Sequence, residues 1–102
     1  MKILTLLFAA LIIAACKPLA MGEQAAIDRC VALCERAVKD DVVLDSQCLG
    51  NLNSVWVCDV SHHPKEPQDN YRENKCKDYA DATHKRFVEV YPNCTFLRIG
   101  SD

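Results

Sequence analysis

Apolar residues recur with a helical period along Ala25 to Lys39, AAIDRCVALCERAVK. A spacing of three or four residues places apolar side chains on one face of a helix, and polar residues occupy the other positions. The apolar face carries Ile27, Cys30, Val31, Cys34, Ala37 and Val38. The pattern therefore predicts an amphipathic helix that packs one side against a core.

Three short segments rich in β-branched and aromatic residues predict strands. They are VWVCDV at Val55 to Val60, KRFVEV at Lys85 to Val90 and TFLRI at Thr95 to Ile99. Pro92 and Asn93 favour a turn between the last two, so we expect a C-terminal hairpin. Residues 40–54 show neither period and are expected to form a connector.

These elements predict an α+β fold, a small disulfide-rich domain with one N-terminal amphipathic helix packed on a short antiparallel sheet. Alternation along the first strand places Trp56, Cys58 and Val60 on one face and Asp59 on the other. We expect the Trp56 face to be buried, with the Trp56 ring covering a disulfide.

A continuous apolar run, ILTLLFAALIIAAC, occupies Ile3 to Cys16 between Lys2 and Lys17. A positive residue followed by a short apolar run is typical of a secretory signal peptide. A helix that spans a bilayer needs about 20 apolar residues, and this run is shorter. We therefore expect residues 1–15 to be a cleaved signal peptide. A buried core helix is the alternative, and it is disfavoured because no polar face interrupts the run.

The end of the run, IAAC at Ile13 to Cys16, resembles the lipobox of prokaryotic lipoproteins, whose signal peptide is cut before a cysteine that is acylated. This resemblance implies lipidation at Cys16. Residues 16–24 are then expected to be a tether, and residues 25–102, from the predicted helix onward, the disulfide-stabilised domain. Cleavage after Gly22 is the alternative, since Ala20 and Gly22 supply the small residues that a signal peptidase recognises. The protein is expected to be exported, either lipid-anchored on the outer face of the cytoplasmic membrane or secreted.

The chain contains seven cysteines, and either cleavage accounts for Cys16. The remaining six are Cys30, Cys34, Cys48, Cys58, Cys76 and Cys94. An even number in a small exported domain predicts three disulfides. Cys30 and Cys34 lie one turn apart on the same helical face, so we expect them to bond different segments. Cys48 is the nearest candidate partner for Cys34.

Composition disfavours several classes of function. The net charge is −2, and no basic stripe is interleaved with aromatic residues, so we expect no nucleic-acid partner. With only three glycines, a phosphate-cradling loop is not expected either, and the prediction includes no cofactor. Oxidised cysteines leave no thiolate for nucleophilic catalysis.

The segment WVCDVSHHPKEPQDN, from Trp56 to Asn70, concentrates side chains that could carry chemistry. A zinc or copper site could use His62 and His63 together with Asp59 or His84. Adjacent side chains on an extended segment point to opposite sides, which disfavours a shared ion. We therefore expect no metal site, with these four residues as the candidates if one exists.

An enzyme is also the less favoured interpretation. Asp59 and Glu89 lie on predicted strands and could serve as a carboxylate pair for hydrolysis, but carboxylates on strand faces are more often solvated. The preferred hypothesis is a binding or structural module of the cell envelope. Its contact surface would be the loop that carries His62, His63, Asp69 and Asn70, and its partner an envelope protein or a glycan.

The blocks WVCDVSHHP, DNYRENKC and HKRFVEVYPNC, with CVALC upstream, resemble a group of short, exported, cysteine-rich proteins of archaea. The resemblance spans Cys30 to Ile99, and the Trp-Val-Cys-Asp block is its most specific part. It implies an exported prokaryotic protein. Because that group has no assigned activity, the resemblance implies no mechanism.

Overall fold

The structure is a computed structural model, and it describes residues 21–77 and 86–101. Within these residues the elements are α2 (Glu23–Lys39), β1 (Gln47–Asn51), β2 (Trp56–Val60), the short 3-10 helices η1 (Pro67–Asn70) and η2 (Arg72–Asn74), β3 (Arg86–Val90) and β4 (Phe96–Ser101). The expected signal peptide, Cys16 and His84 lie outside the described residues. In the described part, no helix is long and apolar enough to span a bilayer.

The predicted helix is present as α2, and it begins at Glu23, two residues earlier than expected. Extended Gly22 precedes it, and its carbonyl accepts the first helical hydrogen bond, from Ala26 N–H at 3.0 Å. Glu23 lies in the first turn and Lys39 in the last, where each charge complements the helix dipole. The helix therefore includes the last two residues of the expected tether.

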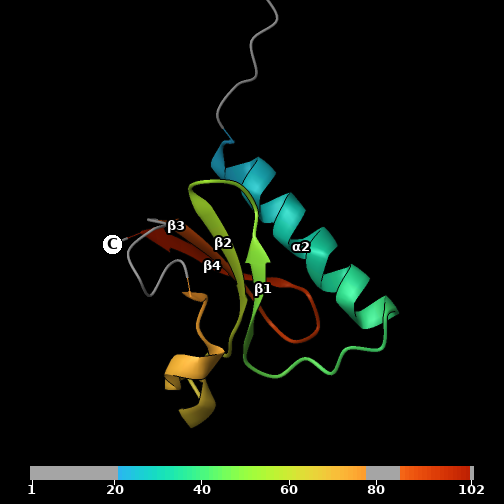
Figure 1. The fold of residues 1–102 in the computed structure, drawn as a ribbon, viewed down its shortest axis with the longest axis vertical. Helices are drawn as coiled ribbons and strands as arrows, with labels where there is room; N and C mark the ends of the chain where they lie inside the picture. The colour runs from blue at the N-terminus through green and yellow to red at the C-terminus, as the bar shows by residue number, and fades with distance from the viewer. Residues whose placement is uncertain (1–20, 78–85, 102) are drawn as a thin grey trace, which may run out of the picture.

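The four strands form one sheet in the order β1-β2-β3-β4 (Figure 1). β1 is antiparallel to β2 and β3 is antiparallel to β4, which confirms the C-terminal hairpin. The central pair, β2 and β3, is parallel, so the sheet is mixed rather than purely antiparallel. The connection between these strands runs over residues 61–85, which is long enough for the crossover that a parallel pair requires.

β1 was not expected, because it lies inside the predicted connector. Its sequence, QCLGN, contains no β-branched or aromatic residue, and Gly50 has a φ of 128°, a conformation that favours glycine. The pairing with β2 shifts register between Cys48 and Gly50. This strand forms through pairing with its neighbour rather than through its own propensity.

The core lies between α2 and the sheet face that it covers, which we call the α2 face (Figure 1). β2 contributes Trp56, Cys58 and Val60 to it, and β3 contributes Val88 and Val90; all five are at most 1% exposed. This confirms the expected burial of the Trp56 side of the strand. Trp56 shares this core with the Cys30–Cys58 disulfide, and its indole N–H donates to the backbone carbonyl of Met21 at 3.3 Å.

The six cysteines form three disulfides, as predicted: Cys30–Cys58, Cys34–Cys94 and Cys48–Cys76. Cys30 and Cys34 bond different segments, so that prediction is confirmed. The suggested pairing of Cys34 with Cys48 is wrong, because Cys34 faces the β3–β4 turn whereas Cys48 lies on the edge strand β1. The three disulfides indicate an oxidising, extracellular compartment.

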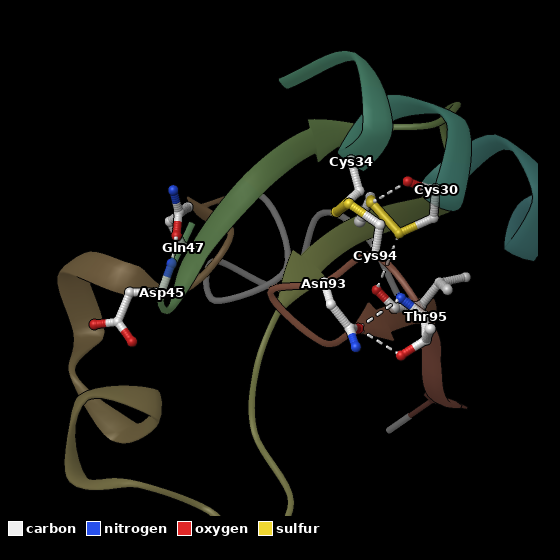
Figure 2. The surroundings of a disulfide bond; sticks show 9 residues. Cys30, Cys34, Asp45, Gln47, Asn93, Cys94 and Thr95 are labelled. Atoms are coloured by element: carbon white, nitrogen blue, oxygen red, sulfur yellow. Dashed lines mark hydrogen bonds between the residues drawn. A yellow bond between two sulfur atoms is a disulfide. The ribbon is translucent and has the colours of Figure 1, made fainter. Parts of the chain in front are cut away.

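The β3–β4 turn is shaped to bring Cys94 to the helix (Figure 2). Asn93 Oδ1 accepts hydrogen bonds from the Thr95 backbone N–H at 3.1 Å and the Thr95 hydroxyl at 2.6 Å. Cys94, between them, has a φ of 70°, which is uncommon for a residue with a side chain. The disulfide and the local hydrogen bonds together hold this turn against α2.

Candidate functional site

The sheet face turned away from α2, which we call the far face, carries the candidate site. Side chains alternate along a strand, so Val57 and Asp59 of β2 and Glu89 of β3 point away from the helix. In the parallel register, Asp59 is the partner of Glu89, and Arg98 of β4 is the antiparallel partner of Glu89. The two carboxylates considered in the sequence are therefore neighbours, with a cation beside them.

These residues belong to a pocket of about 110 Å³. The strands supply one side, including Asp59, Glu89 and Arg98, together with the apolar Val57 and Phe87. The segment after β2 supplies the other side, with Lys65, Asp69, Lys75 and Cys76. Sequence reasoning identified the acidic residues of this site but not its three basic ones, since they carry no local pattern that distinguishes them from ordinary surface charges.

Asp59 is the most perturbed group of the site. Its Oδ1 atom is buried and has no hydrogen-bond partner among the described residues. Burial and the negative charges of Glu89 and Asp69 together raise the pKa of Asp59 to about 8, partly opposed by the positive charge of Lys65. The carboxyl is therefore mostly neutral at and below pH 7. Asp59 lines the pocket, while its unpaired Oδ1 atom is buried.

Glu89 is buried but neutralised. Its side chain is 7% exposed and forms an ion pair with the guanidinium of Arg98, which lies 5.0 Å from the centroid of the Phe87 ring. Gly100 makes room for that ring, because a Cβ at this position would lie 2.5 Å from Phe87 Cζ. Arg98 is thus positioned by both an ion pair and a cation–π contact.

Asp69 organises the loop that follows β2. Its side chain is fully buried and accepts hydrogen bonds from the backbone N–H groups of His62 and Glu66, at 3.2 and 2.9 Å. The Nδ1 atom of His62 lies 3.0 Å from its other oxygen. The second ring nitrogen of His62 faces two more carboxylates, at 3.1 Å from Glu66 and 3.5 Å from Asp45.

These contacts favour a charged pair. The hydrogen bond to Asp69 raises the pKa of His62, although burial opposes it. Burial opposes ionisation of Asp69, but hydrogen bonds from the Glu66 N–H and from His62 outweigh it and lower the pKa of Asp69. The pair therefore holds the loop in place with its charges compensated.

The four loop residues predicted to contact a partner fall into two groups in the structure. His62 and Asp69 are engaged with each other inside the loop, whereas His63 and Asn70 are exposed. In residues 21–77 and 86–101, no group of three or more His, Cys, Asp or Glu side chains could hold a metal ion. Of the metal candidates, His62 is committed to carboxylates and Asp59 lies in the pocket on the far face.

Comparison with known proteins adds no relative: no family model matches the chain, and neither a curated protein nor a solved structure is significantly similar to it. The resemblance to exported archaeal proteins therefore stays a prediction.

Proposed function

We propose that this protein is an exported binding module of the cell envelope, tethered through lipid on Cys16, whose ligand enters the pocket on the far face. The observation that carries the proposal is Asp59, which lines the pocket and whose Oδ1 atom is buried and unpaired among the described residues. Leaving a buried polar group unpaired costs about 1–3 kcal/mol. A cost of this kind in a folded protein calls for an explanation, and a ligand site beside the residue is one.

The rigidity of the scaffold supports a binding role. The pocket floor belongs to the central strands β2 and β3, and the Cys30–Cys58 disulfide anchors β2 to α2 from behind. The Cys48–Cys76 disulfide ties a pocket residue to β1. A site that is held in its bound geometry before the ligand arrives loses less entropy on binding.

The start of the domain favours the lipid tether over cleavage after Gly22. Met21 packs against the core, and its carbonyl accepts the Trp56 indole hydrogen bond. The Gly22 carbonyl accepts the first hydrogen bond of α2. A cut after Gly22 would remove both contacts and place a positive terminus at the N-terminal end of the helix dipole. A cut before Cys16 keeps them.

A hydrolase is the alternative function suggested by the carboxyl pair of Asp59 and Glu89. One neutral and one charged carboxyl group can act as acid and base in glycoside hydrolysis. Here Glu89 is bound by Arg98 and nearly buried, so it is poorly placed to accept a proton from water or to attack a substrate. This ion pair is the reason that we favour binding over hydrolysis.

The proposal can be tested by NMR on oxidised, ¹⁵N-labelled protein from residue 16 onward, with Cys16→Ser to prevent acylation. Small amines, carboxylates, phosphates and sugars would be added one at a time. We expect amide shifts that converge on Val57, Asp59 and Phe87. Shifts confined to the exposed His63 and Asn70, or to α2, would contradict a pocket on the far face.

A further inference from the structure

We infer that the pocket takes a small oxyanion, the carboxylate or phosphate group of a larger ligand, which binds between Lys65 and Lys75 and above Asp59. This inference rests on the proposed function and defines the charge of the ligand group. The charge of the ligand group is inferred from which charged residues around the pocket are already compensated and which are not.

Two of the three acidic residues of the pocket are already compensated. Glu89 is paired with Arg98. Asp69 has the His62 ring and two backbone N–H groups within hydrogen-bond distance. Neither carboxylate has its charge free to attract a cationic ligand.

The third acidic residue, Asp59, is mostly neutral at and below pH 7 because burial and neighbouring charges raise its pKa to about 8. A neutral carboxyl group has one O–H donor in addition to its acceptor sites. Its proton can be donated to an anion, and such O–H···O⁻ hydrogen bonds are short and strong. Asp59 is thus a donor at the pocket wall rather than a repelling charge.

The surplus charge of the pocket is therefore positive. Lys65 and Lys75 are exposed residues that line it, and neither forms an ion pair with another residue of the described segments. Two ammonium groups and one neutral donor around the same pocket are complementary to an oxyanion. A cationic ligand group would instead meet two like charges there.

The volume of the pocket limits the size of the ligand group that it can hold. A pocket of about 110 Å³ is well below the roughly 300–1,000 Å³ of a site that encloses a whole drug-sized ligand. This accommodates a carboxylate or a phosphate group but leaves the rest of a ligand outside. Val57 and Phe87 line the pocket as well and offer apolar contact to the carbon atoms next to the anionic group.

Binding should depend on pH through Asp59. The charged or titratable groups that face it are Glu89 of β3, Arg98 of β4, Asp69 of η1, and Lys65 and Lys75 of the connecting segments. An anion binds best while Asp59 is protonated, so its affinity should fall as the pH rises through about 8. Well above pH 8, each further pH unit should lower the affinity by a factor that approaches ten. An Asp59→Asn variant should bind at pH 7 and lose this dependence.

The test is an NMR titration of the Cys16→Ser protein with sodium acetate, inorganic phosphate and methylammonium, each at pH 6.5 and pH 9. We expect acetate or phosphate to shift the amides of Val57, Asp59 and Phe87 at pH 6.5, and to bind at least tenfold more weakly at pH 9. A response to phosphate alone, or to acetate alone, would support the inference and identify the ligand group.

The double variant Lys65→Gln/Lys75→Gln should weaken binding at least tenfold, while Lys39→Gln at the end of α2 serves as the matched control. Melting curves would verify that each variant is folded. Oxyanion binding unchanged in the double variant would overturn the inference. Methylammonium bound in place of the anions would also overturn it, but would leave the proposed pocket intact. If no compound of any charge shifts pocket amides, the proposed function fails as well.

Discussion

The two faces of the sheet are built from alternate residues of the same strands, yet one buries apolar side chains and the other buries carboxyl groups. On the α2 face, Trp56 and Val88 are buried in an apolar core that two disulfides connect to the helix. On the far face, the neighbouring strand positions hold Asp59 and Glu89. Apolar burial stabilises the first face, whereas buried carboxyl groups lower the stability of the second. This difference indicates that the α2 face supports the fold and that the far face is available for function.

The largest effect should come from Trp56→Ala on the α2 face. Removing a buried aromatic side chain from a core costs about 3–5 kcal/mol. Here the change also removes the hydrogen bond to Met21 and the stacking of Arg86, whose guanidinium carbon lies 4.2 Å from the ring centroid. Chemical denaturation would measure the loss. Val55→Ala, at a residue that is 41% exposed, is the control and should change stability by at most about 0.5 kcal/mol.

On the far face, Asp59→Asn should stabilise the protein at high pH. The folded pKa of Asp59 is about 8 and its ordinary value is 3.8, so between these pH values the unfolded chain loses the proton while the folded one keeps it. Stability should therefore fall as pH rises from 4 to 8, by at most about 1.4 kcal/mol per pH unit. Denaturation curves at several pH values should show this slope in the parent and a shallower one in the variant. Equal slopes would contradict the raised pKa.

Changing both Cys48 and Cys76 to Ala removes their disulfide and should affect the far face more than the α2 face. Loss of a disulfide that closes a loop of this length costs about 3.5 kcal/mol in the chain-entropy model. Because Cys76 lines the pocket, binding on the far face should weaken, while the Trp56 environment on the α2 face is retained. Ligand titration and Trp fluorescence would be compared. A blue-shifted, native-like Trp spectrum together with lost binding is the expected result.

The smallest of these effects on stability is expected at two adjacent histidines, His62 and His63, and it should differ between them. His62→Gln should cost about 1–3 kcal/mol, because it weakens the partner of the buried Asp69. His63→Gln, at an exposed position, should have almost no effect. The folded pKa of His62 is raised, so its contribution is fully present below about pH 6.5 and is lost as pH rises through the folded value. Melting curves in which the two variants behave alike at pH 5.5 would contradict the role of His62.

Local patterns in the sequence were sufficient for much of the fold. The three-four spacing around Cys30 and Cys34 defines α2, because a helix has its own period whatever it packs against. Alternation in VWVCDV and KRFVEV similarly indicates β2 and β3. The even cysteine count predicted three disulfides, and the shared helical face of Cys30 and Cys34 predicted that they bond different segments.

The candidate site was predictable only in part. Asp59 and Glu89 could be considered as a pair because both lie on recognisable strands, but their proximity depends on the parallel register of β2 and β3. Arg98 joins them through the register of the hairpin. His62 and Asp69 were assigned to a contact loop, and their mutual hydrogen bond depends on how that loop folds back over seven residues.

The sequence by itself determined the segments that form α2, β2, β3 and β4, the apolar side of the helix and of β2, and the oxidised state of the cysteines, since these depend on neighbouring residues and composition. Tertiary structure decided the strand β1, the parallel pairing at the centre of the sheet, the partner of each cysteine and the position of the basic residues around Asp59. These features depend on contacts between residues far apart in the chain. Loop closure and strand register select such contacts from many alternatives that have the same local pattern.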